Sequence, residues 1–159
     1  MERVEKSKII KMKKLLLLLM LVPMMVSAQW TYETVDNGFD ESYKIAYTKR
    51  VSGAWLKLEN VDGDIILYIQ GIFFCNDDDT EVDISFMVAG KWEKYNGSGL
   101  VSNDQTTVFI EPNMLTSGML EDFKAATSVK IRIRQTYCDE QIFEYNMSGS
   151  TKALNFMKS

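Results

Sequence analysis

The stretch that decides the fold is VKIRIRQTYCDEQIFEYNMS, residues 129–148. Apolar and charged side chains alternate along Val129–Arg134, and apolar and polar side chains alternate along Phe143–Ser148. A period of two residues is typical of a strand that buries one face and exposes the other. The stretch therefore predicts a β-hairpin with one apolar face and one charged face.

The register of this hairpin is predicted by keeping the two faces apart. A three-residue tip, Asp139–Gln141, places Phe143 opposite Tyr137. It also places Met147 opposite Ile133, so that apolar side chains meet. A two-residue tip sets Arg132 beside Met147 and Arg134 beside Tyr145, which mixes the faces. Because burial selects the register of a strand pair, we expect the three-residue tip.

The N-terminal residues are predicted to direct export. A basic start at residues 11–14 is followed by an apolar run, Leu15–Val26, and by the small residues of a cleavage site at Val26–Ala28. The apolar run is too short for a comfortable membrane span. We therefore expect a cleaved signal peptide at 1–28 and a single β-sandwich domain at 29–159. The protein should be periplasmic or secreted in a bacterium, and not membrane-spanning after cleavage.

The charge balance narrows the choice of partners. The chain carries 18 basic residues, 22 acidic residues and no histidine. Removal of residues 1–28 takes away six basic and two acidic residues, which leaves a net charge of −8. An acidic protein of this kind is poorly suited to bind nucleic acid or an anionic membrane surface. We expect a protein or cell-envelope component as the partner, with a glycan as the alternative.

Cys75 and Cys138 are the two cysteines of the chain. In an exported protein, two cysteines are most simply one disulfide, which the chain-entropy model values at about 4 kcal/mol for a loop of this size. The alternatives are two free thiols or half of a metal site. A zinc site without histidine would need carboxylates to complete the ligand set, which is rare.

The rest of the chain predicts short elements separated by turn signals. Strands are expected at Trp30–Val35, Tyr43–Thr48, Ala54–Val61, Ile65–Phe74, Val82–Val88, Lys91–Tyr95 and Thr106–Ile110, before the two strands of the hairpin. Short amphipathic helices are expected at Gly118–Ala126 and Ser150–Met157. About nine strands with one or two short helices predict an all-β fold, an antiparallel β-sandwich.

The dipeptide Asp62-Gly63 suits a two-residue hairpin of type I′, which pairs Leu58 with Leu67 on the inner face. The surrounding segment, Asn60–Asp64, also resembles a fragment of a calcium-binding loop. It lacks the downstream glutamate of such a loop, so the hairpin turn explains it better.

The apolar strand Ile65–Phe74 is expected to pair with Val82–Val88 through a five-residue tip, Asn76–Thr80. This pairing requires the inward positions to change from odd to even numbers. A β-bulge near Gln70-Gly71 produces such a change, and the alternative is a central strand covered on both faces. After the next strand, the glycine-rich Asn96–Gly99 predicts a flexible loop.

Three segments resemble a known group of proteins. They are IILYIQGIFFC (65–75), EVDISFMVAGKWEKY (81–95) and VKIRIRQTYCDEQIFEYNMSGSTKALNFM (129–157). Their pattern resembles the invasion-associated locus B-like proteins and the periplasmic proteins associated with type VI secretion, which are small exported β-sandwich proteins. The resemblance covers the C-terminal half of the chain. It implies a periplasmic or secreted sandwich without known catalysis, and it provides no active site to carry over.

Acidic residues gather at two predicted hairpin tips. They are Asp77, Asp78, Asp79 and Glu81 on one tip and Asp139 and Glu140 on the other. If the disulfide joins the tips, these carboxylates converge, and clusters of oxygen ligands suit Ca²⁺. The alternative is that they are solvated turns that keep the protein soluble. No EF-hand spacing is present, so we favour the solvated turns and expect no other cofactor.

Trp92 and Tyr95 are the candidate residues for stacking against a sugar ring, together with Trp30, Tyr32 and Trp55. Aromatic side chains in sandwiches more often pack in the core or across strands.

The alternating Lys130, Arg132 and Arg134 form a basic stripe in an acidic protein. The stripe is either a site for an acidic partner or a solvent face opposite Glu144, and the second is the simpler interpretation.

Catalysis has little support in the sequence. The absence of histidine removes the commonest general base, and a disulfide-bonded cysteine is not a nucleophile. A pair of catalytic carboxylates, as in glycosidases, is the alternative, but the spacing of the Asp and Glu residues does not indicate which two would form it. The first hypothesis is an exported, non-enzymatic β-sandwich that binds a protein or envelope component. The second is a carbohydrate-binding accessory module, and the third is a small carboxylate-dependent glycan hydrolase.

Overall fold

The computed structural model describes residues 29–36, 38, 42–75 and 80–159. Its strands are β1 (Trp30–Val35), β2 (Tyr43–Thr48), β3 (Trp55–Val61), β4 (Asp64–Gln70), β5 (Thr80–Val88), β6 (Lys91–Val101), β7 (Thr107–Ile110), β8 (Ser128–Arg134) and β9 (Gln141–Asn146). Its helices are a 3₁₀ turn, η1 (Pro112–Met114), and two α-helices, α2 (Ser117–Ala125) and α3 (Ser150–Lys158). The all-β, antiparallel, sandwich-like fold is confirmed.

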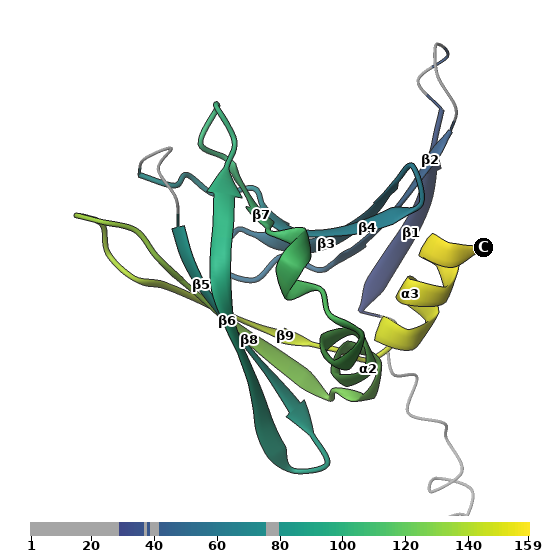
Figure 1. The fold of residues 1–159 in the computed structure, drawn as a ribbon. Helices are drawn as coiled ribbons and strands as arrows, with labels where there is room; N and C mark the ends of the chain where they lie inside the picture. Colours follow the sequence, from purple (N-terminus) through teal and green to yellow (C-terminus); the bar gives the residue numbers. More distant parts are fainter. Residues whose placement is uncertain (1–28, 37, 39–41, 76–79) are drawn as a thin grey trace, which may run out of the picture.

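The strands form one antiparallel sheet in the order β1-β2-β3-β4-β7-β6-β5-β8-β9. Figure 1 shows that this sheet bends strongly, with α2 and α3 between its two sides. We call β1–β4 with β7 the first arm, and β5, β8 and β9 the second arm. The longest strand, β6, joins them because its start pairs with β5 and its end with β7. The arms face each other as the two layers of a sandwich do, although they belong to one sheet.

The core fills the space between the arms. Leu56 and Leu67 of the first arm and Ile84 and Ile131 of the second arm are completely or almost completely buried. Phe123 of α2 lies between them, with its ring centroid 5.7 Å from that of Trp30 and 6.0 Å from that of Phe86. Helix α3 adds its apolar side to this core through three buried residues, Ala153, Leu154 and Met157. The inner face of each strand thus carries the buried apolar side chains of the core, and the alternate residues form the outer faces.

Local signals predicted several elements closely. The first two strands have the expected bounds, and the two helices differ from the prediction by one residue at most at each end. At the β3–β4 turn, Asp62 (φ 52°) and Gly63 (φ 95°) both have the left-handed backbone that a type I′ turn requires. Leu58 accordingly lies opposite Leu67, as predicted.

The predicted register of the β8–β9 hairpin is wrong. Phe143 lies opposite Ile131 rather than Tyr137, and the chain between Arg134 and Gln141 is an irregular connection instead of a three-residue tip. Burial fixes which side chains share a face, but a slip by an even number of residues leaves the faces unchanged. The side-chain oxygen of the buried Gln135 accepts a hydrogen bond from the backbone N–H of Cys75. This contact stabilises the longer connection.

The predicted pairing of the fourth and fifth strands is also wrong. Strand β4 pairs with β3 and β7, whereas β5 pairs with β6 and β8. The change of inward positions is real, because Ile69 and Phe74 are both fully buried. It occurs where β4 ends, at Gly71 (φ 109°), whose added Cβ would lie 2.9 Å from the ring of Trp55. The glycine therefore allows the chain to leave the strand past this ring.

The glycine-rich segment predicted as a flexible loop lies inside a strand. Strand β6 runs without interruption to Val101, through Gly97 and Gly99. A Cβ on Gly97 would meet the side chain of Met114, and a Cβ on Gly99 would lie 2.7 Å from Val108. These glycines allow η1 and β7 to approach the strand closely, which is a packing role rather than a flexible one.

Candidate functional site

The disulfide Cys75–Cys138 is present, as predicted, with its Cα atoms 6.3 Å apart. It joins the end of the first arm to the β8–β9 connection, across 63 residues of sequence. Next to it, the side-chain amide of Gln141 donates to the backbone oxygen of Phe73 at 3.4 Å. The bridge thus fixes two segments that the sheet itself does not pair.

The residues of the predicted calcium site are only partly described by the structure. Asp77, Asp78 and Asp79 lie outside the described residues. Of the rest, Glu140 has a carboxylate oxygen 3.7 Å from Nε of Arg132, and Asp139 has no ion pair within the described part of the chain. In that part, no group of three or more His, Cys, Asp or Glu side chains is placed to hold a metal ion. The calcium site remains a prediction.

Trp92 and Tyr95 are not side by side. They are three residues apart on β6 and therefore point to opposite faces of the sheet. Tyr95 packs inward against Phe86 and donates its hydroxyl to Asp122 of α2 at 2.5 Å. Burial and this hydrogen bond raise the pKa of Tyr95 to about 12. Trp92 lies on the outer face, 4.9 Å from Nζ of Lys130, so the two rings cannot form one stacking platform.

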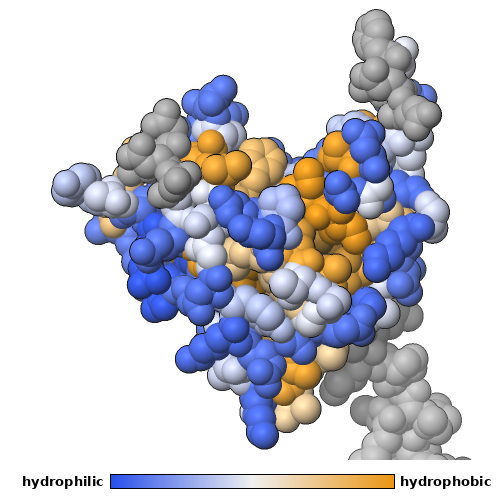
Figure 2. Space-filling model, in the orientation of Figure 1, coloured by the Kyte–Doolittle hydropathy of each residue, from blue (hydrophilic) through white to orange (hydrophobic). Residues whose placement is uncertain are grey.

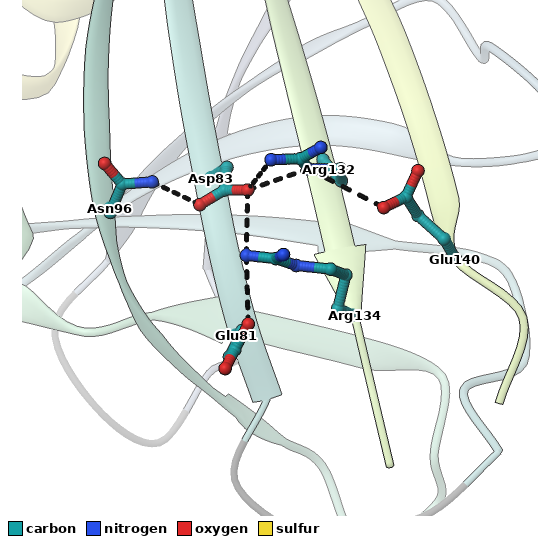
Figure 3. A network of polar contacts seen from close by, with 6 residues as sticks. All are labelled: Glu81, Asp83, Asn96, Arg132, Arg134 and Glu140. Atoms are coloured by element: carbon teal, nitrogen blue, oxygen red, sulfur yellow. Dashed lines mark hydrogen bonds and ion pairs between the residues drawn. The ribbon is translucent and has the colours of Figure 1, made fainter. Parts of the chain in front are cut away.

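The basic stripe meets a carboxylate at the centre of the second arm. Figure 3 shows Asp83 of β5 between Asn96 of β6 and Arg132 of β8, with the guanidinium of Arg134 between Asp83 and Glu81. Asp83 Oδ2 accepts from Nε of Arg132 at 2.7 Å and from Arg134 at 3.1 Å, and Oδ1 accepts from Asn96. Glu81, further along β5, pairs with Arg134 at 2.9 Å. The solvent-face interpretation of the stripe is thus the better one for Arg132 and Arg134.

This network holds Asp83 in its ionised form. Burial raises the pKa of the Asp83 carboxyl, but hydrogen bonds from Arg132 and Asn96 and the charges of both arginines outweigh it, and the pKa lies below its ordinary value. A carboxylate whose two oxygens accept four hydrogen bonds has little capacity left to act as a general acid. Its role is to tie β5, β6 and β8 together.

A second polar and aromatic cluster covers the outer face of the first arm. Cross-strand pairs align one side chain from each strand in a row. From β2 to β6 the row contains Tyr47, Lys57, Tyr68, Phe109 and Leu100. Trp55 lies next to the row on β3, with the guanidinium carbon of Arg50 3.7 Å from its ring centroid. We call the five side chains of the row, with Trp55, the aromatic face.

The aromatic face is organised around Lys57. Its Nζ lies 5.7 Å from the ring centroids of Tyr47 and Trp55 and 5.6 Å from that of Tyr68, and it donates to Gln70 at 2.6 Å. Burial among these rings lowers the pKa of Lys57. Cation–π attraction between the ammonium group and the rings stabilises their arrangement, so the rings are held in place.

Hydrogen bonds fix the two tyrosines of the row. Tyr47 donates to Glu33 at 2.5 Å, and Tyr68 donates to Glu59 at 2.9 Å. The hydrogen bond to Glu33 and burial raise the pKa of Tyr47. At the other end of the row, Leu100 is 52% exposed and has no such constraint. The face therefore combines rigid rings with an apolar side chain in solvent.

Sequence reasoning selected only Trp55 of this face. The hairpin register at Asp62-Gly63 was sufficient to place Lys57 opposite Tyr68. Tyr47 and Phe109 join the row through longer connections, in which no turn signal fixes the partner strand. The β3–β4 hairpin alone therefore predicts two members of the row, Lys57 and Tyr68.

Apolar side chains are also visible in the opening between the arms, inside a hydrophilic rim (Figure 2). A groove of about 540 Å³ at this place is lined by the β3–β4 turn and by apolar side chains, among them Ile66 of β4, Leu115 directly after η1, and Leu120 of α2. In the portion of the chain that the structure describes, no helix is long and apolar enough to cross a membrane.

Comparison with known proteins identifies the fold. No protein-family model and no curated protein matches the chain. Among solved structures, invasion associated protein B from Bartonella henselae is similar, with a TM-score of 0.56 and 12% identity over 82% of this chain and 92% of that protein. At this identity the likeness concerns the fold, which agrees in part with the resemblance drawn from the C-terminal half of the sequence.

Proposed function

We propose that this is an exported, non-enzymatic bacterial protein that binds a protein component of the cell envelope through the aromatic face. The observation that carries this proposal is the row from Tyr47 to Leu100, in which tyrosine rings around one lysine end in an exposed leucine. Aromatic residues and arginine are enriched in the energetic centres of protein interfaces. Rings that are already held in place lose little conformational entropy on binding.

The geometry favours a protein over a glycan as the occupant. A sugar stacks on the flat, open side of an aromatic ring. Arg50 covers a side of Trp55, Lys57 lies close to three rings, and Tyr68 is only 5% exposed. The planes of Tyr68 and Phe109 are tilted by 43° to each other, which does not give a flat platform. A tilted surface that mixes Lys57 and Arg50 with Glu33 and Glu59 suits the side chains of another protein.

Export is supported by the disulfide, which is typical of proteins in oxidising compartments. The predicted signal peptide at residues 1–28 supports it independently. The similar protein from Bartonella henselae is described as invasion associated, and a role in contact with a partner at or beyond the envelope accords with that description.

The test is affinity capture from an envelope extract with two matched variants. Leu100 and Ile142 are both apolar, both on outer faces, and 52% and 56% exposed. Burial of a leucine contributes about 1.5–3 kcal/mol, so Leu100→Lys should weaken capture of the specific partner by about tenfold or more. Ile142→Lys makes the same change far from the aromatic face and should leave capture unchanged.

Two results would contradict the proposal. The first is equal capture by both variants, and the second is capture of nothing by the unaltered protein. A glycan array probed with the unaltered protein and with Leu100→Lys examines the alternative function. If the unaltered protein binds a defined glycan and Leu100→Lys does not, the ligand of the aromatic face is a carbohydrate and not a protein.

A further inference from the structure

The outer face of the second arm contains a hollow of about 240 Å³ that the aromatic face does not share. The strand registers explain its shape. Ser85 of β5 lies between Lys94 of β6 and Lys130 of β8, and in the next row Asp83 lies between Asn96 and Arg132. The Ser85 side chain is small, and hydrogen bonds from Asn96 and the two arginines hold the Asp83 side chain close to the sheet. These two residues therefore form the floor of the hollow. The longer side chains on both sides form the walls, and Ile142 of β9 adds an apolar edge.

The hollow has an excess of positive charge in an acidic protein. Three basic side chains and one carboxylate line it. That carboxylate, Asp83, is already neutralised by two arginines. Within the described part of the chain, Lys130 forms an ion pair with one acidic residue, Glu144, at 3.5 Å, and both side chains are about half exposed. Such an exposed pair contributes little, so the positive charge of Lys130 is still available to a ligand.

Two donors at the hollow have no partner among the residues that the structure describes. They are Nζ of Lys94 and the hydroxyl of Ser85, which make neither a hydrogen bond nor an ion pair there. Strands are about 4.8 Å apart, so the two lysines leave the sheet roughly 10 Å from each other on either side of the serine. An anionic group above Ser85 would lie between them, and charge-assisted hydrogen bonds to it are the strong ones.

We propose that this hollow binds the anionic group of a small acidic sugar, a phosphate or a carboxylate, with Lys94 and Lys130 as its ligands and the Ser85 hydroxyl as a further donor. The volume is below the range of about 300–1,000 Å³ typical of pockets for drug-sized ligands, which limits the occupant to about one sugar unit. The exposed Ile142 provides an apolar contact for the sugar ring. This site is independent of the aromatic face.

The experiment is a titration of the isotope-labelled, purified protein followed by NMR at low ionic strength. The probes are glucuronate, glucose 6-phosphate, inorganic phosphate and glucose. Both acidic sugars should shift the backbone amides around Ser85, Lys94 and Lys130 saturably, and bind at least about tenfold more tightly than glucose, because each charge-assisted hydrogen bond is worth about that factor. Tighter binding of glucose 6-phosphate than of inorganic phosphate would show that the sugar also contacts the hollow.

Variants separate the site from a general effect of charge. Lys94→Gln and Lys130→Gln should each weaken binding by about tenfold, and Lys91→Gln should not, because Lys91 begins the same strand as Lys94 but does not line the hollow. Unchanged melting temperatures would show that all three variants are folded. Absence of saturable shifts, equal binding of glucose, or an equal loss in Lys91→Gln would each overturn the proposal.

Discussion

Removal of one charge at the centre of the second arm should destabilise the fold measurably. Asp83→Asn keeps the shape of the side chain and one acceptor oxygen but removes the negative charge that faces Arg132 and Arg134. In the native protein the Asp83 side chain is 11% exposed, whereas both arginine side chains are 43% exposed. The substitution therefore leaves two partly exposed cations close together without the charge that lies between them.

The expected loss follows from these exposures. Deleting one partner of a fully buried ion pair costs about 3–5 kcal/mol, and a hydrogen bond to a charged group contributes about 1.5–3 kcal/mol. Because solvent reaches the arginines, the range for a hydrogen bond to a charged group applies, and not the range for a fully buried ion pair. We therefore expect a loss of about 2 kcal/mol in the free energy of unfolding. With a typical urea m-value, this lowers the denaturation midpoint by about 1 M.

The loss should depend on pH in a defined direction. The pKa of Asp83 is lower in the folded protein than in the unfolded chain, where it is about 3.9. Its contribution to stability is therefore complete above about pH 5 and disappears as the pH falls through the folded value. The difference between the native protein and Asp83→Asn should be largest near pH 7 and should shrink below about pH 4.

Urea denaturation at a series of pH values measures this difference. Glu81→Gln is the matched control, because Glu81 lies on the same strand and the same face and pairs with the same Arg134, but is 72% exposed. Exposed pairs contribute little, so this variant should lose less than about 0.5 kcal/mol. The reasoning fails if Asp83→Asn loses no more than Glu81→Gln, or if its loss is the same at pH 3 and pH 7.

Four further perturbations test the packing. Replacement of Cys75 and Cys138 by serine should cost about 4 kcal/mol, and a loss below about 1 kcal/mol in urea denaturation would contradict the role of the bridge. Gly99→Ala should cost about 1–3 kcal/mol, because its Cβ would lie 2.7 Å from a valine side chain and 3.0 Å from a backbone oxygen. Gly118→Ala, with no atom nearer than 3.9 Å, should instead gain up to about 1 kcal/mol in thermal unfolding. Phe123→Ala should cost about 3–5 kcal/mol, and a smaller loss in calorimetry would show that the helix is not part of the core.

The strands and helices could be predicted from the sequence because their signals are local. The alternation in Val129–Arg134 gave the correct faces, and the Asp62-Gly63 turn gave the correct partner. The pairing of β5 could not be found in this way. Its apolar positions fit β4 and β8 equally well, and the choice depends on β6 and β7 entering the sheet between β4 and β5.

The same limit applies to the candidate sites. Cys75 and Cys138 could be paired because the chain has no other cysteine. Trp92 and Tyr95 are close in sequence, but an odd separation along a strand places two side chains on opposite faces. The aromatic face and the hollow at Ser85 both consist of cross-strand neighbours, so they become visible only when the order of the strands is known.

The most direct test of the central claim, that the aromatic face binds a protein partner, is site-specific photo-cross-linking in the producing cell. A photo-reactive phenylalanine derivative replaces Leu100 in one variant and Ile142 in the other, two positions of nearly equal exposure. We predict one discrete cross-linked protein from position 100 and none from position 142. The same products from both positions, or no product from position 100, would contradict the claim.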